Sequence, residues 1–230
     1  MTISGAPSSL GVILSANSFT SKLFGQSPSQ LERRNISVLL PPPFSTFHDD
    51  LLSKYLESGV GRIVDYTRVV LGLHKQGHSF LMLLSVRETS TADKSIAFIG
   101  IMRALLSSEQ QIVMDSDGRI TACSLESLGL LGLTPEVLAS ERPRMSDWVV
   151  EWSHVQDALA LEAGTKILIT APSDVAQVDA LVTGARGTVV NADAGVWIHA
   201  HVQPITLPNG VSISVLHWHR MATDKYMVRC

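Results

Sequence analysis

Two groups of residues in this sequence carry side chains that bind metals or exchange protons. The first is an imidazole with a carboxylate directly after it, His48 and Asp49, followed later in the chain by the guanidinium of Arg68. The second is a set of four histidines in two i, i+2 pairs: His199, His201, His217 and His219. Imidazole is a common metal ligand and titrates near neutral pH. The sequence shows no Walker loop, GxSxG elbow or kinase signature, so it predicts a protein that is not an enzyme.

A helix beginning after Pro41-Pro42-Pro43 is expected to position His48. Proline restricts the backbone that enters the helix, and Gly59 is expected to end it in the left-handed conformation. At about 100° per residue the apolar side chains of this helix fall in one arc, namely Phe44, Phe47, Leu51, Leu52, Tyr55 and Leu56. His48 falls inside the same arc. The periodicity therefore predicts that His48 points inward, while the polar residues face water: Asp49, Asp50, Ser53 and Glu57.

The elements around this helix are predicted from their composition and turn residues. Short helices are expected over 19–24, capped by Asn17 and ended by Gly25, and over 28–31. Strands are expected over 10–16, 69–73, 80–86 and 96–105, and residues 2–4 are all that could form an opening strand. Gly77 is expected to supply the positive φ of the turn between the second and third of these strands. Both faces of the strand over 80–86 are largely apolar, which predicts cover on both sides.

These residues carry a resemblance to a known family. The order "NI..LLP.P....HD..L..Y...G" from Asn35 to Gly59, then "LSV" and "FIG" ending near Arg103, resembles the PAS domain. The resemblance implies an α+β fold in which a five-stranded antiparallel sheet cups a ligand pocket under short helices. Within the family the pattern is similar to the heme-binding PAS domains of the FixL oxygen sensors. It is also similar to PAS modules of large eukaryotic membrane proteins.

The FixL-like resemblance implies roles for particular residues. His48 matches the histidine that binds heme iron, and Arg68 matches the arginine that hydrogen-bonds a heme propionate or the bound gas. Apolar positions on the distal side are matched by Ile63, Leu84 and Val86. Lys54 stands where an arginine is seen in that family, which puts one propionate contact in doubt. Because the same histidine and arginine occur in PAS domains without heme, a purely structural histidine is the alternative.

Flavin chemistry of the blue-light type requires a reactive cysteine within "NCRFL". This chain has Asn35-Ile36-Ser37-Val38-Leu39 at that place, so a covalent photoadduct is excluded. Non-covalent flavin and other apolar ligands stay open.

The second half of the chain repeats the opening of a PAS domain. It contains a strand over 110–115, a turn at 116–118, a strand over 119–124 and a helix over 125–133. Helical pieces over 157–163 and 175–182 are followed by strands over 188–191, 196–205 and 211–220. We therefore predict two PAS domains, over 1–106 and 107–222, with a boundary near Ser107 and Ser108 and a tail over 223–230.

The strand register decides whether the four histidines form a metal site. A two-residue Asn209-Gly210 turn would pair Pro208 with Val211. Odd positions of one strand would then lie opposite even positions of the other. This register predicts that the four histidines split between the two faces of the sheet, which argues against a metal site.

Composition limits the functional classes. The net charge of -3 gives no basic signal for nucleic acid, and no apolar run reaches the length of a membrane span. Two cysteines suit a reducing compartment, so we expect a cytoplasmic chain, or the soluble part of a membrane-associated parent. The first functional hypothesis is a sensory tandem PAS fragment that binds a small ligand, heme among the candidates. The alternative is a ligand-free interaction module. In both, the expected partner is a second copy or another PAS or signalling domain.

Overall fold

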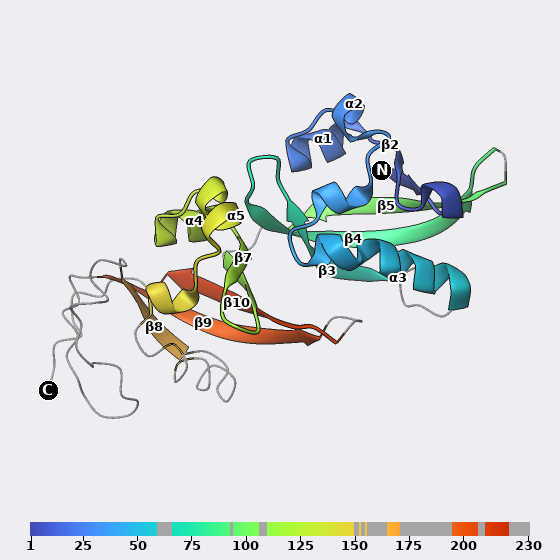
Figure 1. The fold of residues 1–230 in the computed structure, drawn as a ribbon. Coiled ribbons are helices and arrows are strands. Elements are labelled where there is room, and N and C mark those ends of the chain that lie inside the picture. The colour runs from blue at the N-terminus through green and yellow to red at the C-terminus, as the bar shows by residue number, and fades with distance from the viewer. Residues whose placement is uncertain are drawn as a thin grey trace, which may run out of the picture. The chain divides into compact units, whose positions relative to one another are not determined.

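The computed structural model describes residues 1–58, 66–92, 94–105, 110–149, 152, 155, 165–170, 195–206 and 210–220. The chain divides into two compact units, Met1–Ser107 and Ser108–Cys230 (Figure 1). All four tryptophans belong to the second unit. Within the described ranges, the structure contains no helix that is both long and apolar enough to cross a membrane.

The first unit is built on a five-stranded antiparallel sheet with the order β2-β1-β5-β4-β3. Its strands are β1 (Thr2–Ser4), β2 (Ile13–Ser15), β3 (Thr67–Leu73), β4 (Ser79–Ser90) and β5 (Ile96–Ala104). The opening strand β1 is short but present, and it lies between two neighbours: Ile3 pairs with Ile13 of β2 and with Phe98 of β5. Residues 2–4 therefore complete the sheet within the chain.

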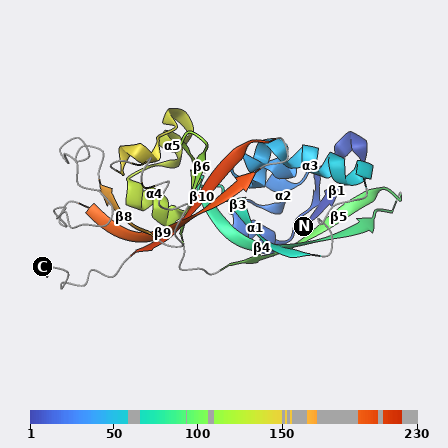
Figure 2. The same cartoon turned by 90° about the horizontal axis from the view of Figure 1, so that it is seen from below.

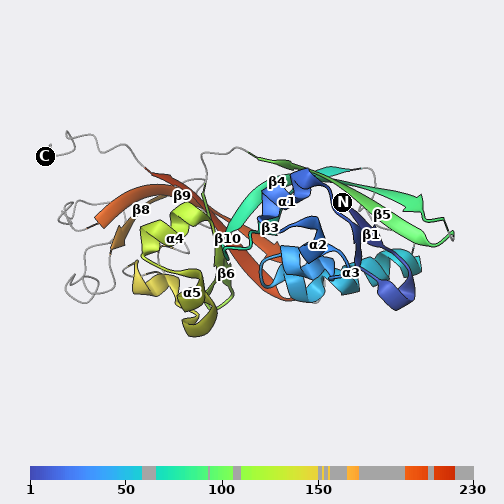
Figure 3. The same ribbon diagram turned by 90° about the horizontal axis from the view of Figure 1, so that it is seen from above.

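In the described part of this unit, three α-helices and two 3-10 helices accompany the sheet: α1 (Ser18–Phe24), α2 (Pro28–Leu31), α3 (Phe44–Ser58), η1 (Pro7–Ser9) and η2 (Ile36–Leu39). Figures 2 and 3 show α1, α2 and α3 on the same side of the sheet. The predicted caps of α1 are confirmed. The Asn17 side chain accepts the Thr20 N–H at 2.9 Å, and Gly25 ends the helix at φ 72°. A Cβ on Gly25 would clash with the His74 ring, so glycine is required for space as well as for conformation.

The two faces of the first sheet follow from its register. Arg68 lies opposite Leu84, and Leu84 lies opposite Met102, so their side chains share one face. This is the inner face, because Met102 packs against the buried core under the helices. The alternate positions form the outer face, where Val69 lies opposite Leu83. Gly77 in the β3–β4 hairpin has a φ of 85°, as the sequence predicts.

The second unit has a sheet of the same strand order, β7-β6-β10-β9-β8. Its elements are β6 (Gln110–Asp115), β7 (Ile120–Cys123), α4 (Leu125–Leu131), α5 (Pro135–Glu141), η3 (Met145–Asp147), β8 (Thr165–Thr170), β9 (Gly195–Thr206) and β10 (Ser212–Arg220). Numbered within each unit, both sheets therefore read 2-1-5-4-3. Strands β6, β7, β9 and β10 and helix α4 are confirmed, whereas β8 was not predicted. The predicted pieces over 157–163, 175–182 and 188–191 lie outside the described residues.

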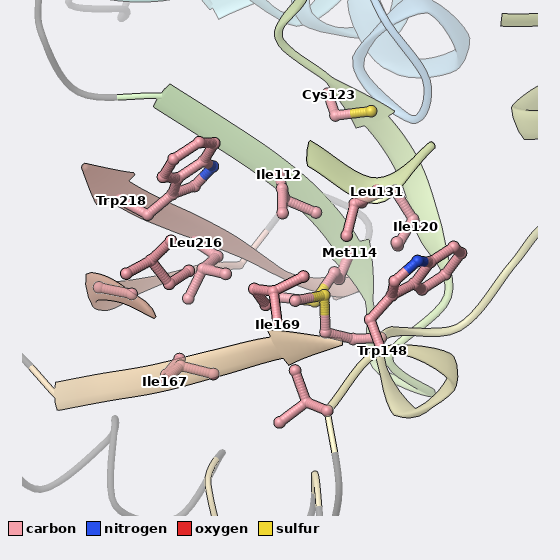
Figure 4. Close-up of a cluster of buried hydrophobic side chains, with 14 of the residues drawn as sticks. Ile112, Met114, Ile120, Cys123, Leu131, Trp148, Ile167, Ile169, Leu216 and Trp218 are labelled. Carbon is pink, nitrogen blue, oxygen red and sulfur yellow. The ribbon is translucent and has the colours of Figure 1, made fainter. Parts of the chain in front are cut away.

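Large side chains fill the interior of the second unit (Figure 4). Trp148 and Leu216 are buried, and the Trp218 indole N–H donates to Ser127 Oγ at 2.8 Å. The Ser127 hydroxyl in turn donates to the Gln111 carbonyl at 3.0 Å. The buried indole N–H and the buried hydroxyl therefore both have hydrogen-bond partners. Cys123 is fully buried, and burial raises the pKa of its thiol to about 12. This thiol is therefore a core group and not a nucleophile.

The predicted register of the β9–β10 hairpin is wrong. The last paired residues are Thr206 and Ser212, so the connection is longer than the two-residue turn assumed from Asn209-Gly210. The pairing places His201 opposite His217 and His199 opposite His219. Because a shift of one residue moves every side chain of a strand to the other face, the correction brings all four histidines onto one face.

Candidate functional site

His48 lies on α3 with its imidazole turned partly into the first unit. The side chain is 24% exposed, and Nδ1 is 3.9 Å from Asp49 Oδ1, beyond hydrogen-bond range. Nδ1 is itself buried and has no hydrogen-bond partner among the residues that the structure describes. The predicted inward orientation is confirmed, although of the apolar arc on this helix only Leu52 is fully buried. The other apolar side chains of this arc are half-buried and form, with Leu52, the apolar wall on which His48 lies: Phe44, Phe47, Leu51, Tyr55 and Leu56.

Burial is the main influence on the charge of His48. It lowers the pKa of the imidazole from its ordinary value of 6.5, the neighbouring Asp49 carboxylate raises this pKa, and the Arg68 guanidinium lowers it. The net pKa is lowered, so the imidazole is neutral at pH 7. A neutral imidazole offers the lone pair that a metal ligand needs.

Three of the other predicted site residues face the same interior. Arg68 on β3 is half-buried and lies opposite Leu84, and Val86 follows two residues later on the same face of β4. Val86 packs against the buried core of the unit. The positive charge of the Arg68 guanidinium also lowers the pKa of His48. The structure therefore brings His48, Arg68, Leu84 and Val86 to one side of the sheet.

One predicted site residue, Lys54, does not join them. Lys54 is exposed on α3. Its backbone carbonyl accepts a hydrogen bond from the Ser58 hydroxyl at 2.6 Å. The exposed position gives no support to a contact between Lys54 and a heme propionate. Ile63 lies outside the described residues.

Asp49 has a structural role that sequence reasoning missed. The Asn35 side-chain N–H donates to Asp49 Oδ2 at 2.8 Å and to the Leu10 carbonyl at 3.3 Å, while Asn35 Oδ1 accepts the Ser37 N–H at 2.8 Å. A Cβ on Gly11 would lie 2.9 Å from both side chains. The carboxylate thus ties α3 to η2 and to the segment before β2. Asn35 and Asp49 both belong to the motif from Asn35 to Gly59, and this shared membership was the signal in the sequence that could have indicated their contact.

We predict that His48 makes the stability of the first unit depend on pH. Its pKa in the folded chain is lower than the ordinary 6.5, so below about pH 6.5 the unfolded chain binds more protons than the folded one. The free energy of unfolding should fall as pH drops through 6.5 and stop falling below the folded pKa. His48→Gln should flatten this part of the profile. Urea unfolding between pH 5 and 8 measures both slopes, and identical slopes in the two proteins would contradict the prediction.

Comparison with known proteins matches the PAS fold family to residues 9–105. A probable serine/threonine-protein kinase from Dictyostelium discoideum is 37% identical over 128 residues, which cover 56% of this chain and 8% of that protein. The sensor protein FixL from Bradyrhizobium diazoefficiens is 26% identical over 131 residues, covering 57% of this chain and 26% of FixL. This chain therefore spans only a small part of either relative.

Among solved structures, the PAS domain of the fruit-fly ELK potassium channel has 16% identity and a TM-score of 0.36. The match covers 46% of this chain and 85% of that domain. The match of the family over 9–105, taken with the five-stranded sheet and the helices on its inner face, gives the identity of the first unit. Residues 9–105 of this chain are a PAS domain.

Proposed function

We propose that the first unit is the sensory domain of a larger signalling protein and binds a small ligand between α3 and the inner face of β3, β4 and β5. One observation carries this proposal. The imidazole of His48 is held neutral on a half-buried apolar wall, and its buried Nδ1 is unpaired within the described part of the chain. A buried polar atom without a partner is costly, which favours a ligand that pairs with this ring nitrogen.

Heme is the ligand that these residues fit best. His48 would bind the iron, Arg68 would provide a charged hydrogen-bond donor on the same side of the sheet, and Leu84 and Val86 would contact the apolar ring. When bound, heme supplies an open coordination position for a diatomic gas. The exposed Lys54 is left out of the proposed site. A non-covalent flavin or another flat apolar ligand would use the same wall without the iron bond.

The test is titration of the purified chain with hemin while its visible absorption is recorded. We expect an intense visible band that His48→Ala abolishes, because no other histidine lies on α3. His74→Ala, on the β3–β4 hairpin of the same unit, is the matched control and should retain the band. Arg68→Ala should weaken gas affinity or heme retention but leave the iron bond intact. Absence of heme uptake, or equal uptake by the His48→Ala variant, would rule heme out.

A second candidate function is an interaction module that works without a ligand. The observation that favours it is the exposed apolar outer face of the first sheet. Val69 is 53% exposed and Ile101 is 52% exposed, with Ile99 next along β5 on the same face. Exposed apolar side chains on one sheet face are typical of a protein interaction site. We propose that this outer face binds a second copy of the chain or another signalling domain.

Sedimentation tests the self-association. We expect Ile101→Glu to shift the chain from dimer toward monomer, because a charge would have to be buried in an apolar interface. Ile96→Glu is the matched control, since Ile96 is 39% exposed on the same strand but belongs to the opposite face. It should sediment like the unchanged chain. A wild-type chain that stays monomeric at high concentration would refute the dimer.

For the second unit we propose a divergent PAS domain whose interior is filled by its own side chains. The shared strand order 2-1-5-4-3 and the large buried residues of Figure 4 support this proposal. We further propose a cytoplasmic location, supported by the low count of two cysteines, and no binding of nucleic acid, supported by the net charge of -3. We do not assign kinase activity to this chain, because its match covers only 8% of the Dictyostelium relative.

A further inference from the structure

Four of the eight histidines of this chain lie together on one face of the second sheet. The rings of His201 and His217 are stacked with centroids 4.9 Å apart and planes 10° apart. The rings of His199 and His219 have centroids 5.1 Å apart and planes 37° apart. Residues at i and i+2 of a strand share a face, so the two facing pairs are neighbours along β9 and β10.

We propose that this face binds a divalent transition-metal ion of the Zn²⁺, Cu²⁺ or Ni²⁺ class. His201 and His217 supply the first two nitrogen ligands, and His199 and His219 supply the others. The proposal does not depend on the ligand of the first unit, because it uses only residues of β9 and β10. It reverses the conclusion drawn from the sequence, since that conclusion depended on the wrong register.

The ligand chemistry selects the class of metal. Next to the histidine pairs on this face lie Gln111, opposite His217, and Val215, opposite Gln203. The carboxylate of Asp115, on the same face, lies opposite Ile213, four positions from His217 along β10. It already accepts the N–H groups of Asp117 and Arg119, each at 2.9 Å. A nitrogen-only set is suited to zinc, copper and nickel, whereas magnesium and calcium prefer oxygen ligands.

Binding requires the rings to turn from their stacked arrangement. Within the described residues, no three histidine, cysteine or carboxylate side chains already converge on one point. A metal bond to imidazole nitrogen is about 2.0–2.1 Å long, so each facing pair must turn its ring edges toward the ion. His219 is exposed and the other three rings are half-buried. The rings that must rotate are therefore not enclosed by the core.

Calorimetric titration of the intact chain with ZnCl₂, NiCl₂ or CuCl₂ tests the proposal. We expect one ion per chain. Replacing His201 and His217 together by asparagine should weaken binding by well over about tenfold, because loss of an outer-shell partner alone costs roughly 10–100-fold. The quadruple asparagine variant should not bind. The matched control is His74→Asn with His78→Asn, a stacked pair on the β3–β4 hairpin with centroids 4.6 Å apart, which should bind as before.

Electron paramagnetic resonance of the Cu²⁺ complex gives a second, spectroscopic readout of the same site. Hyperfine coupling to two or more imidazole nitrogens is expected, and the affinity should fall at acid pH because only neutral imidazole binds a metal. His48→Ala should leave this signal unchanged, which separates the site from the heme proposal. Absence of saturable binding, unchanged affinity in the quadruple variant, or a spectrum without nitrogen coupling would each overturn the proposal.

Discussion

Phe98→Ala is expected to lower the free energy of unfolding of the first unit by about 3–5 kcal/mol, the range for truncating a buried aromatic residue. Phe98 is 1% exposed on β5, where it pairs with Ile3 of β1 and Glu88 of β4. Its ring meets the Tyr55 ring edge-on, with centroids 5.7 Å apart. The substitution would therefore leave a cavity between the sheet and α3, the helix that carries His48.

The effect must be measured with a probe of the first unit. Tryptophan fluorescence reports only the second unit, so hydrogen exchange of peptides from β5 and α3 is the suitable measurement. The matched control is Phe19→Ala, because Phe19 is 47% exposed and its loss should change stability by less than about 1 kcal/mol. A similar small loss for Phe98→Ala would show that the contact between β5 and α3 does not hold this unit together.

Leu216→Ala is expected to destabilise the second unit by about 2–5 kcal/mol. Leu216 is fully buried on β10, which has a partner strand on each side: Leu216 lies opposite Ile112 of β6 and Val202 of β9. The truncation removes contacts in the middle of the sheet, where the chain has little room to collapse into the cavity. The same strand carries His217 and His219, so weaker metal binding should accompany the loss of stability.

Tryptophan fluorescence during urea unfolding measures this loss directly, since Trp148 and Trp218 are buried in the same core. Leu125→Ala is the matched control, because Leu125 is 56% exposed at the start of α4. The control should unfold close to the unchanged chain. Equal midpoints for the two variants would mean that burial of Leu216 contributes little to the second unit.

The sequence by itself determined the features that depend on neighbouring residues. The apolar arc of α3 predicted that His48 points inward, and the caps at Asn17 and Gly25 and the turn at Gly77 were found as expected. Each of these depends on a few dihedral angles and on side-chain periodicity, which the order of residues carries directly. The motif between Asn35 and Arg103 was sufficient to predict the PAS fold, which the family match over 9–105 confirms.

Only the tertiary structure decided the features that depend on distant segments. The contact between Asn35 and Asp49 joins two elements, and the solvent exposure of Lys54 depends on what packs around α3. The register of β9 and β10 is the clearest case. It depends on how a hairpin closes, and an error of one residue in the pairing reverses which side chains share a face. Whether the four histidines stood together or apart could therefore be settled only by the pairing of the strands.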